Sequence, residues 1–149
     1  MGITVLGNTP LHQAAQVGLA NSIQNLLNGS PSSRYKGSNI NAVNHQGFTP
    51  LSLAFALGRV HAIRRLLNHD GVEASINQAD NYGMTALHHA ASYDRNDWII
   101  DLVLKGADTT LKDCDDRLPL QIALNHHNHK AAEALRVYTP KQAIKASEC

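Results

Sequence analysis

A short phrase typical of a helix start occurs four times in this chain, and it constrains the fold more than any other feature. The copies read TPLHQAA from Thr9, TPLSLAF from Thr49, TALHHAA from Thr85 and LPLQIAL from Leu118. Their starts lie 40, 36 and 33 residues apart. A phrase that returns at intervals near 33 residues is typical of a repeat array, in which each unit stacks on the next.

Each copy opens a predicted pair of helices. Thr9 is a good N-cap, and Pro10 stands at the first helical position, where a missing N–H costs nothing. After each first helix, a second segment has apolar residues at helical spacing. The predicted helices are 9–17 and 19–28, 49–57 and 59–68, 85–93 and 95–105, and 118–126 and 128–138, with one more short helix at 141–146.

The phrase resembles the ankyrin motif T-P-L-H-x-A, and the resemblance covers residues 4–138. It implies an all-α ankyrin-repeat solenoid of helix-turn-helix units joined by hairpin-like loops. The implied repeats are about 4–40, 41–76, 77–109 and 110–138. Residues 139–149 are then a C-terminal tail or a short capping helix, which such arrays need at their ends.

Several motif positions carry other residues, most of them in the last repeat. Ser52 and Gln121 stand where the motif has histidine. Asp94 and His127 stand where a glycine separates the two helices of a repeat. Asp116 replaces the glycine of the hairpin turn, although aspartate tolerates a left-handed backbone better than most residues.

A stacked array buries the same positions in every repeat, because no single helix pair can cover its own apolar face. The resemblance implies that His12 and His88 are structural and bond the motif threonine and nearby backbone. Trp98 lies on a second helix, where we expect it to pack. The equivalent positions expected to be buried are Leu11, Leu51, Leu87 and Leu120, and Ala14, Ala54, Ala90 and Ala123.

Charge and composition argue against several classes of partner. The formal net charge is +1, which gives no broad field for gathering nucleic acid or anionic lipid. No apolar stretch approaches the roughly 20 residues that span a bilayer. Cys114 and Cys149 form no known motif, and the first residues do not resemble a secretory signal. We therefore expect a cytoplasmic location, with the nucleus, or the host cytosol for a bacterial effector, as alternatives.

The resemblance implies a non-enzymatic module that binds another protein through a concave face of hairpin tips and first helices. We expect the chain to act as a monomer without a cofactor. Aromatic and methionine side chains gather on the central repeats at positions expected to face solvent, as in binding hot spots. In the alternative interpretation, Phe48 and Met84 fold back onto neighbouring helices. The candidate binding residues are His45, Gln46, Phe48, Leu57, Asn81, Tyr82, Met84, Tyr93, Asp115, Arg117 and His126.

Other surface features are weaker candidates. Residues 29–40 break the repeat period and present Tyr35 in a predicted surface loop. Asp113, Asp115 and Asp116 form an acidic end that could orient a charged partner. A basic strip on the second helix of repeat 2 lies off the expected concave face and consists of Arg59, His61, Arg64 and Arg65.

Three alternatives to a simple binding module stay open. A metal site or a Cys–His enzyme would use Cys114 with His126, His127 and His129, although this spacing matches no known structural zinc pattern. The chain could instead be a scaffold or localisation module, such as an effector of an intracellular bacterium. Ankyrin repeats also resemble substrates of an asparaginyl hydroxylase, and Asn41 and Asn77 stand at the corresponding loop position.

Overall fold

The computed structural model describes residues 7–29 and 39–147, with side chains described as far as residue 144. In these ranges the regular elements are all helical, which confirms the predicted all-α class. The elements are α1 Pro10–Val17, α2 Ala20–Asn28, α3 Pro50–Leu57, α4 Val60–Leu67, the 3-10 helix η1 Val72–Ser75, α5 Ala86–Ala91, α6 Asn96–Leu104, α7 Pro119–Asn125, α8 His129–Tyr138 and α9 Lys141–Ser147.

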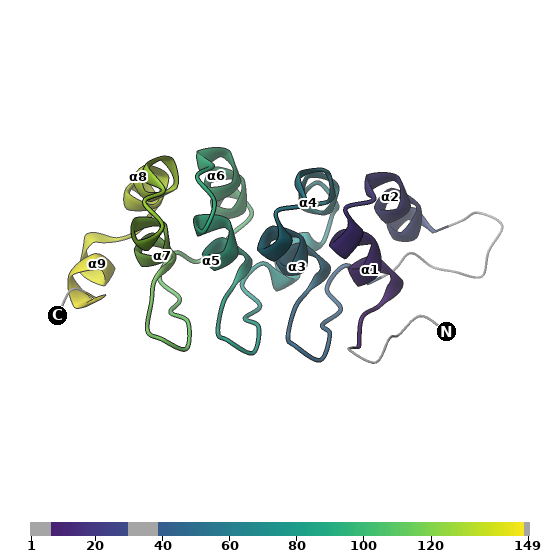
Figure 1. The fold of residues 1–149 in the computed structure, drawn as a ribbon, viewed down its shortest axis with the longest axis horizontal. Helices are drawn as coiled ribbons and strands as arrows, with labels where there is room; N and C mark the ends of the chain where they lie inside the picture. The colour runs from purple at the N-terminus through teal and green to yellow at the C-terminus, as the bar shows by residue number, and fades with distance from the viewer. Residues whose placement is uncertain (1–6, 30–38, 148–149) are drawn as a thin grey trace.

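The helices form two rows, and hairpin loops project from one of them (Figure 1). The first helices α1, α3, α5 and α7 make the row next to the hairpins. The second helices α2, α4, α6 and α8 make the other row, above it in Figure 1. The predicted solenoid is confirmed, whereas the repeat boundaries themselves stay predictions. The loop predicted at 29–40, including Tyr35, lies almost entirely outside the described residues.

The point at which each first helix ends depends on the residue that separates the two helices of the repeat. Gly18 and Gly58 end α1 and α3 with positive φ angles of 84° and 68°. His127 adopts a similar left-handed conformation, with φ 56°, although it carries a Cβ. In repeat 3, which has Asp94 here, α5 ends earlier than predicted, at Ala91. Tyr93 therefore lies beyond the helix and not on its surface.

The core runs between the two rows and continues from repeat to repeat. The motif leucines and alanines are all buried, as predicted, and Trp98 is only 5% exposed. One element was not predicted. The helix η1 occupies the extra residues after α4 and buries Val72 against the core, and Ile76 directly after it is buried as well. At the C-terminal end Ile144 of α9 packs against the same core.

Two buried histidines connect one repeat to the next. His12 Nδ1 accepts a hydrogen bond from the Thr9 N–H, and its Nε2–H donates to the carbonyl of Phe48 at 2.7 Å. His88 makes the same pair of bonds, to Thr85 and to the carbonyl of Arg117. The structural role predicted for both histidines is thus confirmed.

Burial keeps these histidines neutral. Loss of hydration lowers the pKa of His12 and His88 below the ordinary 6.5, although the bonds to backbone carbonyls act in the opposite direction. A lowered pKa in the folded state means that the unfolded chain binds more protons below about pH 6.5. The stability that the two histidines contribute is therefore complete above that pH. It is lost as the pH falls through their folded pKa values.

We predict that the free energy of unfolding falls as the pH drops below about 6.5, and that this slope is shallower in the His12→Gln/His88→Gln variant. Glutamine is a suitable replacement because Gln121 already occupies the equivalent position and accepts the Leu118 N–H at 2.8 Å. Urea unfolding followed by Trp98 fluorescence measures the slope. His61→Gln, at an exposed position, is the control, and an equal slope in the double variant and the control would contradict the prediction.

Candidate protein-binding surface

The three described hairpins share one internal bonding pattern. The Asn44 side chain accepts hydrogen bonds from the N–H groups of Gln46 and Phe48, at 3.0 and 2.9 Å. Asp80 and Asp113 stand at the equivalent positions and accept the equivalent pairs of N–H groups, at 2.9 to 3.0 Å. All three side chains are buried. The N–H groups of the same three residues donate to the carbonyls of Phe48, Met84 and Arg117, so backbone and side-chain hydrogen bonds close each hairpin together.

The turn of each hairpin requires a left-handed backbone. Gly47 and Gly83 have φ angles of 85° and 75°, and Asp116 has 58°. The expectation that Asp116 would tolerate this conformation is confirmed. The hairpins are also closely stacked, because a Cβ added at Gly47 would lie 2.8 Å from the Cα atom of Asp80.

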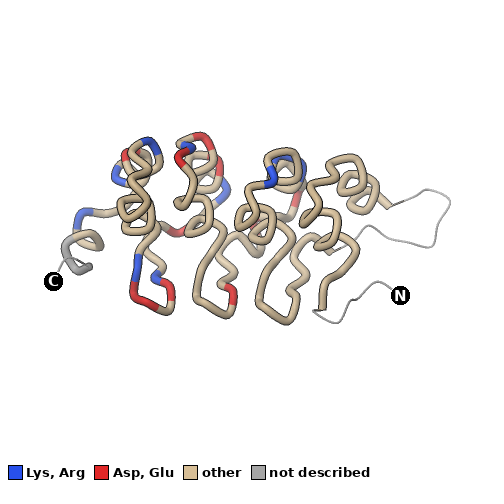
Figure 2. The backbone as a smooth tube through the Cα atoms, viewed as in Figure 1, with Lys and Arg blue, Asp and Glu red and all other residues tan. Residues whose placement is uncertain are grey.

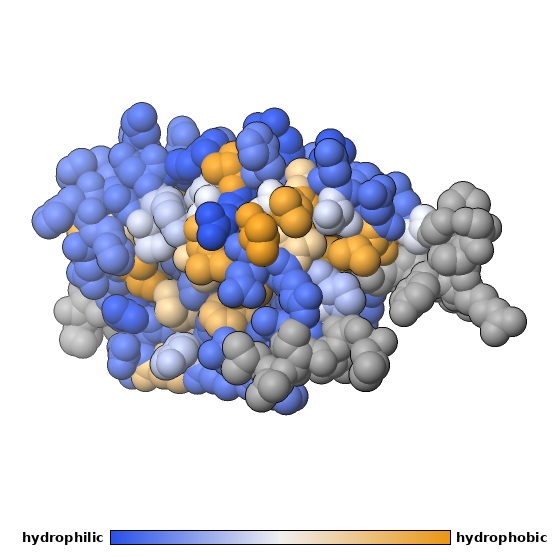
Figure 3. Space-filling model, turned by 45° about the vertical axis from the view of Figure 1, so that its right-hand side comes forward, coloured by the Kyte–Doolittle hydropathy of each residue, from blue (hydrophilic) through white to orange (hydrophobic). Residues whose placement is uncertain are grey.

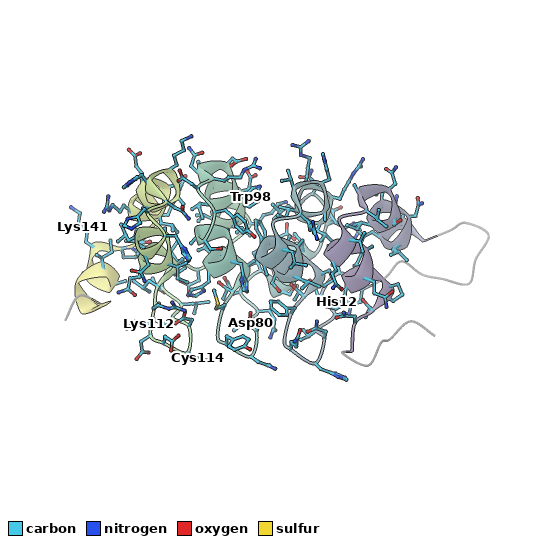
Figure 4. The ribbon with its side chains drawn as sticks, viewed as in Figure 1. His12, Asp80, Trp98, Lys112, Cys114 and Lys141 are labelled. Carbon is cyan, nitrogen blue, oxygen red and sulfur yellow. The ribbon has the colours of Figure 1, made fainter. Side chains whose placement is uncertain are left out.

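Backbone hydrogen bonds join neighbouring hairpins at their tips. The Asn81 N–H donates to the Gln46 carbonyl at 2.9 Å, and the Cys114 N–H donates to the Tyr82 carbonyl at 3.0 Å. We call the surface made by residues 44–48, 80–84 and 113–117 the hairpin ledge. It forms the lower edge of the molecule in Figure 1 and contains Asp80 and Cys114, which Figure 4 labels.

Several of the predicted binding residues are exposed, on the ledge and at the ends of the first helices. Tyr82 is the most exposed of them among the large hydrophobic side chains, at 69%, and Leu57 at the end of α3 is 42% exposed. The remaining exposed candidates are His45, Gln46, Asn81, Asp115 and His126.

Besides Arg117, three predicted binding residues do not face solvent as expected. Phe48, Met84 and Tyr93 are half-buried. The Phe48 ring lies 5.6 Å from that of His89, and Met84 packs against the core. This outcome is the alternative that the sequence left open for Phe48 and Met84.

Tyr93 is the least expected of the three. Its hydroxyl donates a hydrogen bond to the Ala56 carbonyl at 3.0 Å, and its ring meets that of Trp98 edge-on at 5.4 Å. It also lies against Gly58, where a Cβ would be 2.9 Å from the Tyr93 hydroxyl. Tyr93 therefore bridges repeats 2 and 3.

The acidic end of the ledge is partly neutralised. The Arg117 guanidinium donates to the buried Asp113 carboxylate at 2.9 Å and lies 3.4 Å from Asp115. Burial acts to raise the pKa of Asp113, but the hydrogen bonds from Arg117 and from the Asp115 N–H outweigh it and lower that pKa. Arg117 is thus half-buried and occupied, while Asp115 and Asp116 stay exposed.

One side-chain hydrogen bond of the ledge was not predicted from the sequence. His89 Nε2–H donates to Asp80 Oδ2 at 2.9 Å, and the Asp80 side chain is fully buried. The two residues are nine positions apart, and no motif position predicts that a side chain of α5 reaches back to its own hairpin.

The other candidate residues have structural partners or stand apart. Asn77 bonds the Gly106 carbonyl and the Asp108 N–H, and Asn41 bonds the Gly71 carbonyl and the Ser75 hydroxyl. Both asparagines are solvent-accessible, and each joins its own loop to the next one by hydrogen bonds. Their hydroxylation stays a prediction. Of the basic strip, Arg59 donates to the Gln16 carbonyl and Arg65 to the Gln24 side chain, both in repeat 1.

The alternative metal or Cys–His centre finds no support in the described part of the chain. There, no three His, Cys, Asp or Glu side chains are grouped as metal ligands would be. Cys114, His126, His127 and His129 are all exposed. Within the same residues, no helix combines the length and apolar character needed to cross a bilayer.

Comparison with known proteins places this geometry in a family. A sequence model of the family described as "Ankyrin repeats (3 copies)" matches residues 11–113. The chain belongs to the ankyrin-repeat family. Members of this family are protein-interaction modules and are generally non-enzymatic.

Curated relatives carry the same repeats within much longer chains. This ankyrin-repeat chain is 32% identical over 131 residues to the transient receptor potential cation channel subfamily A member 1 of Drosophila melanogaster, a match that covers 87% of this chain and 10% of that protein. It is 30% identical over 118 residues to the neurogenic locus notch homolog protein 1 of Homo sapiens, covering 79% of this chain and 4% of that protein. It is 34% identical over 90 residues to the Rabankyrin-5 of Mus musculus, covering 60% and 7%. The chain thus spans a tenth or less of each relative.

We predict that Tyr93→Phe lowers the free energy of unfolding by about 1 kcal/mol, because the bond to the Ala56 carbonyl is lost. Tyr82→Phe removes the same hydroxyl from an exposed ring and should change stability by less than about 0.5 kcal/mol. Urea unfolding measures both variants. Equal effects would refute the assignment of Tyr93 to packing between repeats.

Proposed function

We propose that this chain binds a segment of a partner protein along the hairpin ledge and the adjoining ends of the first helices. Membership of a family of protein-interaction modules supports this proposal. The single observation that carries it is the exposure of Tyr82 at the centre of the ledge, between the hairpins of repeats 2 and 4.

Tyr82 has the properties of a rigid anchor. Its N–H is held by Asp80 at 2.9 Å, and its carbonyl accepts the Cys114 N–H. An exposed tyrosine on a fixed backbone offers a large amphipathic surface and loses little conformational entropy on binding. Phe48 and Met84 stand at equivalent positions of two successive hairpins. Phe48 packs against His89 and Met84 against the core.

Charge along the ledge suggests how a bound segment is oriented. The hairpin of repeat 2 presents the neutral Gln46 beside His45, whereas that of repeat 4 presents Asp115 and Asp116 (Figure 2). A segment with an apolar side chain on Tyr82 and a lysine or arginine over the acidic tip would match both features.

The ends of the first helices widen this surface. Leu57 and His126 stand at equivalent positions, at the ends of α3 and α7, and both are exposed. On the face shown in Figure 3, apolar side chains lie as patches among hydrophilic ones. The narrower ideas of an effector role, a monomeric state and a cytoplasmic location stay predictions.

The test compares partner capture by three forms of the chain. We expect Tyr82→Ala to reduce capture of the specific partner from a cell lysate by at least tenfold, the loss typical of a central aromatic anchor. Tyr138→Ala removes a 39% exposed tyrosine from α8 on the other row and serves as the matched control. Quantitative mass spectrometry reads both. If Tyr82→Ala and Tyr138→Ala retain the same partners at the same level, Tyr82 is not the anchor.

Asp116→Asn tests the electrostatic part separately. Asparagine tolerates the left-handed backbone at this position, so the turn is preserved while one negative charge is removed. We expect the captured partner to dissociate from this variant at a lower salt concentration than from the wild type.

A further inference from the structure

A groove separates α4 from α6 on the side of the molecule opposite the hairpin ledge. It has a volume of about 350 Å³, and its apolar floor includes Val60, Ile63, Leu67 and Trp98. Leu104 stands at its mouth and is 75% exposed. The other second helices pack directly, α2 on α4 and α6 on α8. Figure 1 shows the wider spacing in the middle of this row, and Figure 4 places Trp98 there.

Large side chains between repeats 2 and 3 keep this groove open. Trp98 stands at the position that holds Ser22, Ala62 and Ala131 in the other repeats. Its ring packs edge-on against Phe55 at 5.4 Å, and Phe55 in turn occupies a position that is alanine in repeats 1 and 3. Aromatic rings thus fill the interface between repeats 2 and 3 near the first helices. They hold the second helices α4 and α6 apart.

Each wall of the groove carries one charge without an ion-pair partner among the described residues. These are Arg64 on α4 and Asp101 on α6. The other charges are occupied: Arg95 pairs with Asp97 at 2.8 Å and lies over the Trp98 ring, and Lys105 lies 3.5 Å from Glu73. The charge without an ion-pair partner in the described part of the chain is therefore positive on the α4 wall and negative on the α6 wall, on either side of an apolar floor.

We propose that this groove is a second docking site, and that its occupant is an amphipathic helix of a partner protein with acidic residues on one flank and basic residues on the other. The walls are helices whose backbone groups are already bonded, so an extended peptide would find no backbone partners there. A helix satisfies its own backbone. Apolar side chains on consecutive turns would fill the hollow beside Trp98 and Leu104, and the flanks would meet Arg64 and Asp101.

Trp98 makes the site directly observable, because it is the only tryptophan in the chain. The probes are synthetic helical peptides of about 14 residues, long enough to form a helix, with leucine along one face. One peptide has a glutamate flank and a lysine flank, and two others have glutamate or lysine on both flanks. We expect the mixed peptide to shift Trp98 emission and to bind about threefold more tightly than either of the others.

Charge variants of the chain should change this preference in opposite directions. Arg64→Glu makes both walls acidic and should favour the peptide with two lysine flanks. Asp101→Lys makes both walls basic and should favour the peptide with two glutamate flanks. Both residues are exposed, so neither change disturbs the core.

The apolar contact has a matched control. Leu104→Asp should weaken binding of the mixed peptide at least tenfold, while Val137→Asp should leave it unchanged. Val137 stands at the equivalent position of the next repeat and is also 75% exposed.

Three results would overturn the proposal. In the first, Trp98 emission stays constant with every peptide. In the second, Leu104→Asp and Val137→Asp change the binding of the mixed peptide equally. Sedimentation could also show self-association of the chain that Leu104→Asp abolishes, which would assign the groove to a second copy and not to a partner helix.

Discussion

Everything in this molecule depends on the hydrogen bonds that tie each hairpin to its neighbours. Asn44, Asp80 and Asp113 close their hairpins, and the backbone N–H groups of Asn81 and Cys114 join one hairpin to the next. His12 and His88 then bond the helix pairs of repeats 1 and 3 to the hairpin that follows each of them. Because a single repeat cannot bury its apolar face, these bonds and the leucine layers stabilise the repeats only together.

The same bonds explain why the ledge suits recognition. Tyr82 is exposed but its backbone is held on both sides, so binding need not order the loop first. Sequence can vary at the exposed tip positions, such as 46, 82 and 115, without disturbing the buried positions 44, 80 and 113. The fold therefore separates the residues that maintain the hairpins from those that can contact a partner.

The interface between repeats 2 and 3 departs from this regularity. Phe55, Tyr93 and Trp98 replace the smaller residues found at most equivalent positions, and their rings pack against each other. One consequence is that Tyr93 is half-buried against the core and bonded to repeat 2, where its hydroxyl is not available to a partner. The other is that α4 and α6 do not close over this layer, which leaves the groove beside Trp98.

Much of the fold follows from the sequence because the repeat phrase recurs with its caps and glycines. The burial of Leu11 and its equivalents follows from the stacking of the repeats, the roles of His12 and His88 follow from the resemblance to the ankyrin motif, and the left-handed Asp116 follows from its turn position. Tyr93, η1 and the His89–Asp80 contact do not follow in this way. They depend on how side chains of different repeats or loops share space, which a single-repeat pattern does not describe. Within the candidate site, sequence correctly predicted which positions form the hairpins, but it did not separate the exposed Tyr82 from the half-buried Phe48 and Met84.

Native-state hydrogen exchange at the hairpin tips tests the central claim most directly. We predict that the Asn81 and Cys114 amides are strongly protected, and that a destabilising core change such as Leu87→Ala weakens the protection of both together. The exchange rates of the same amides in the chain unfolded by urea provide the unprotected reference. If the Asn81 and Cys114 amides of the folded chain exchanged as fast as in the unfolded chain, the hairpins would not be joined in solution and the central claim would be wrong.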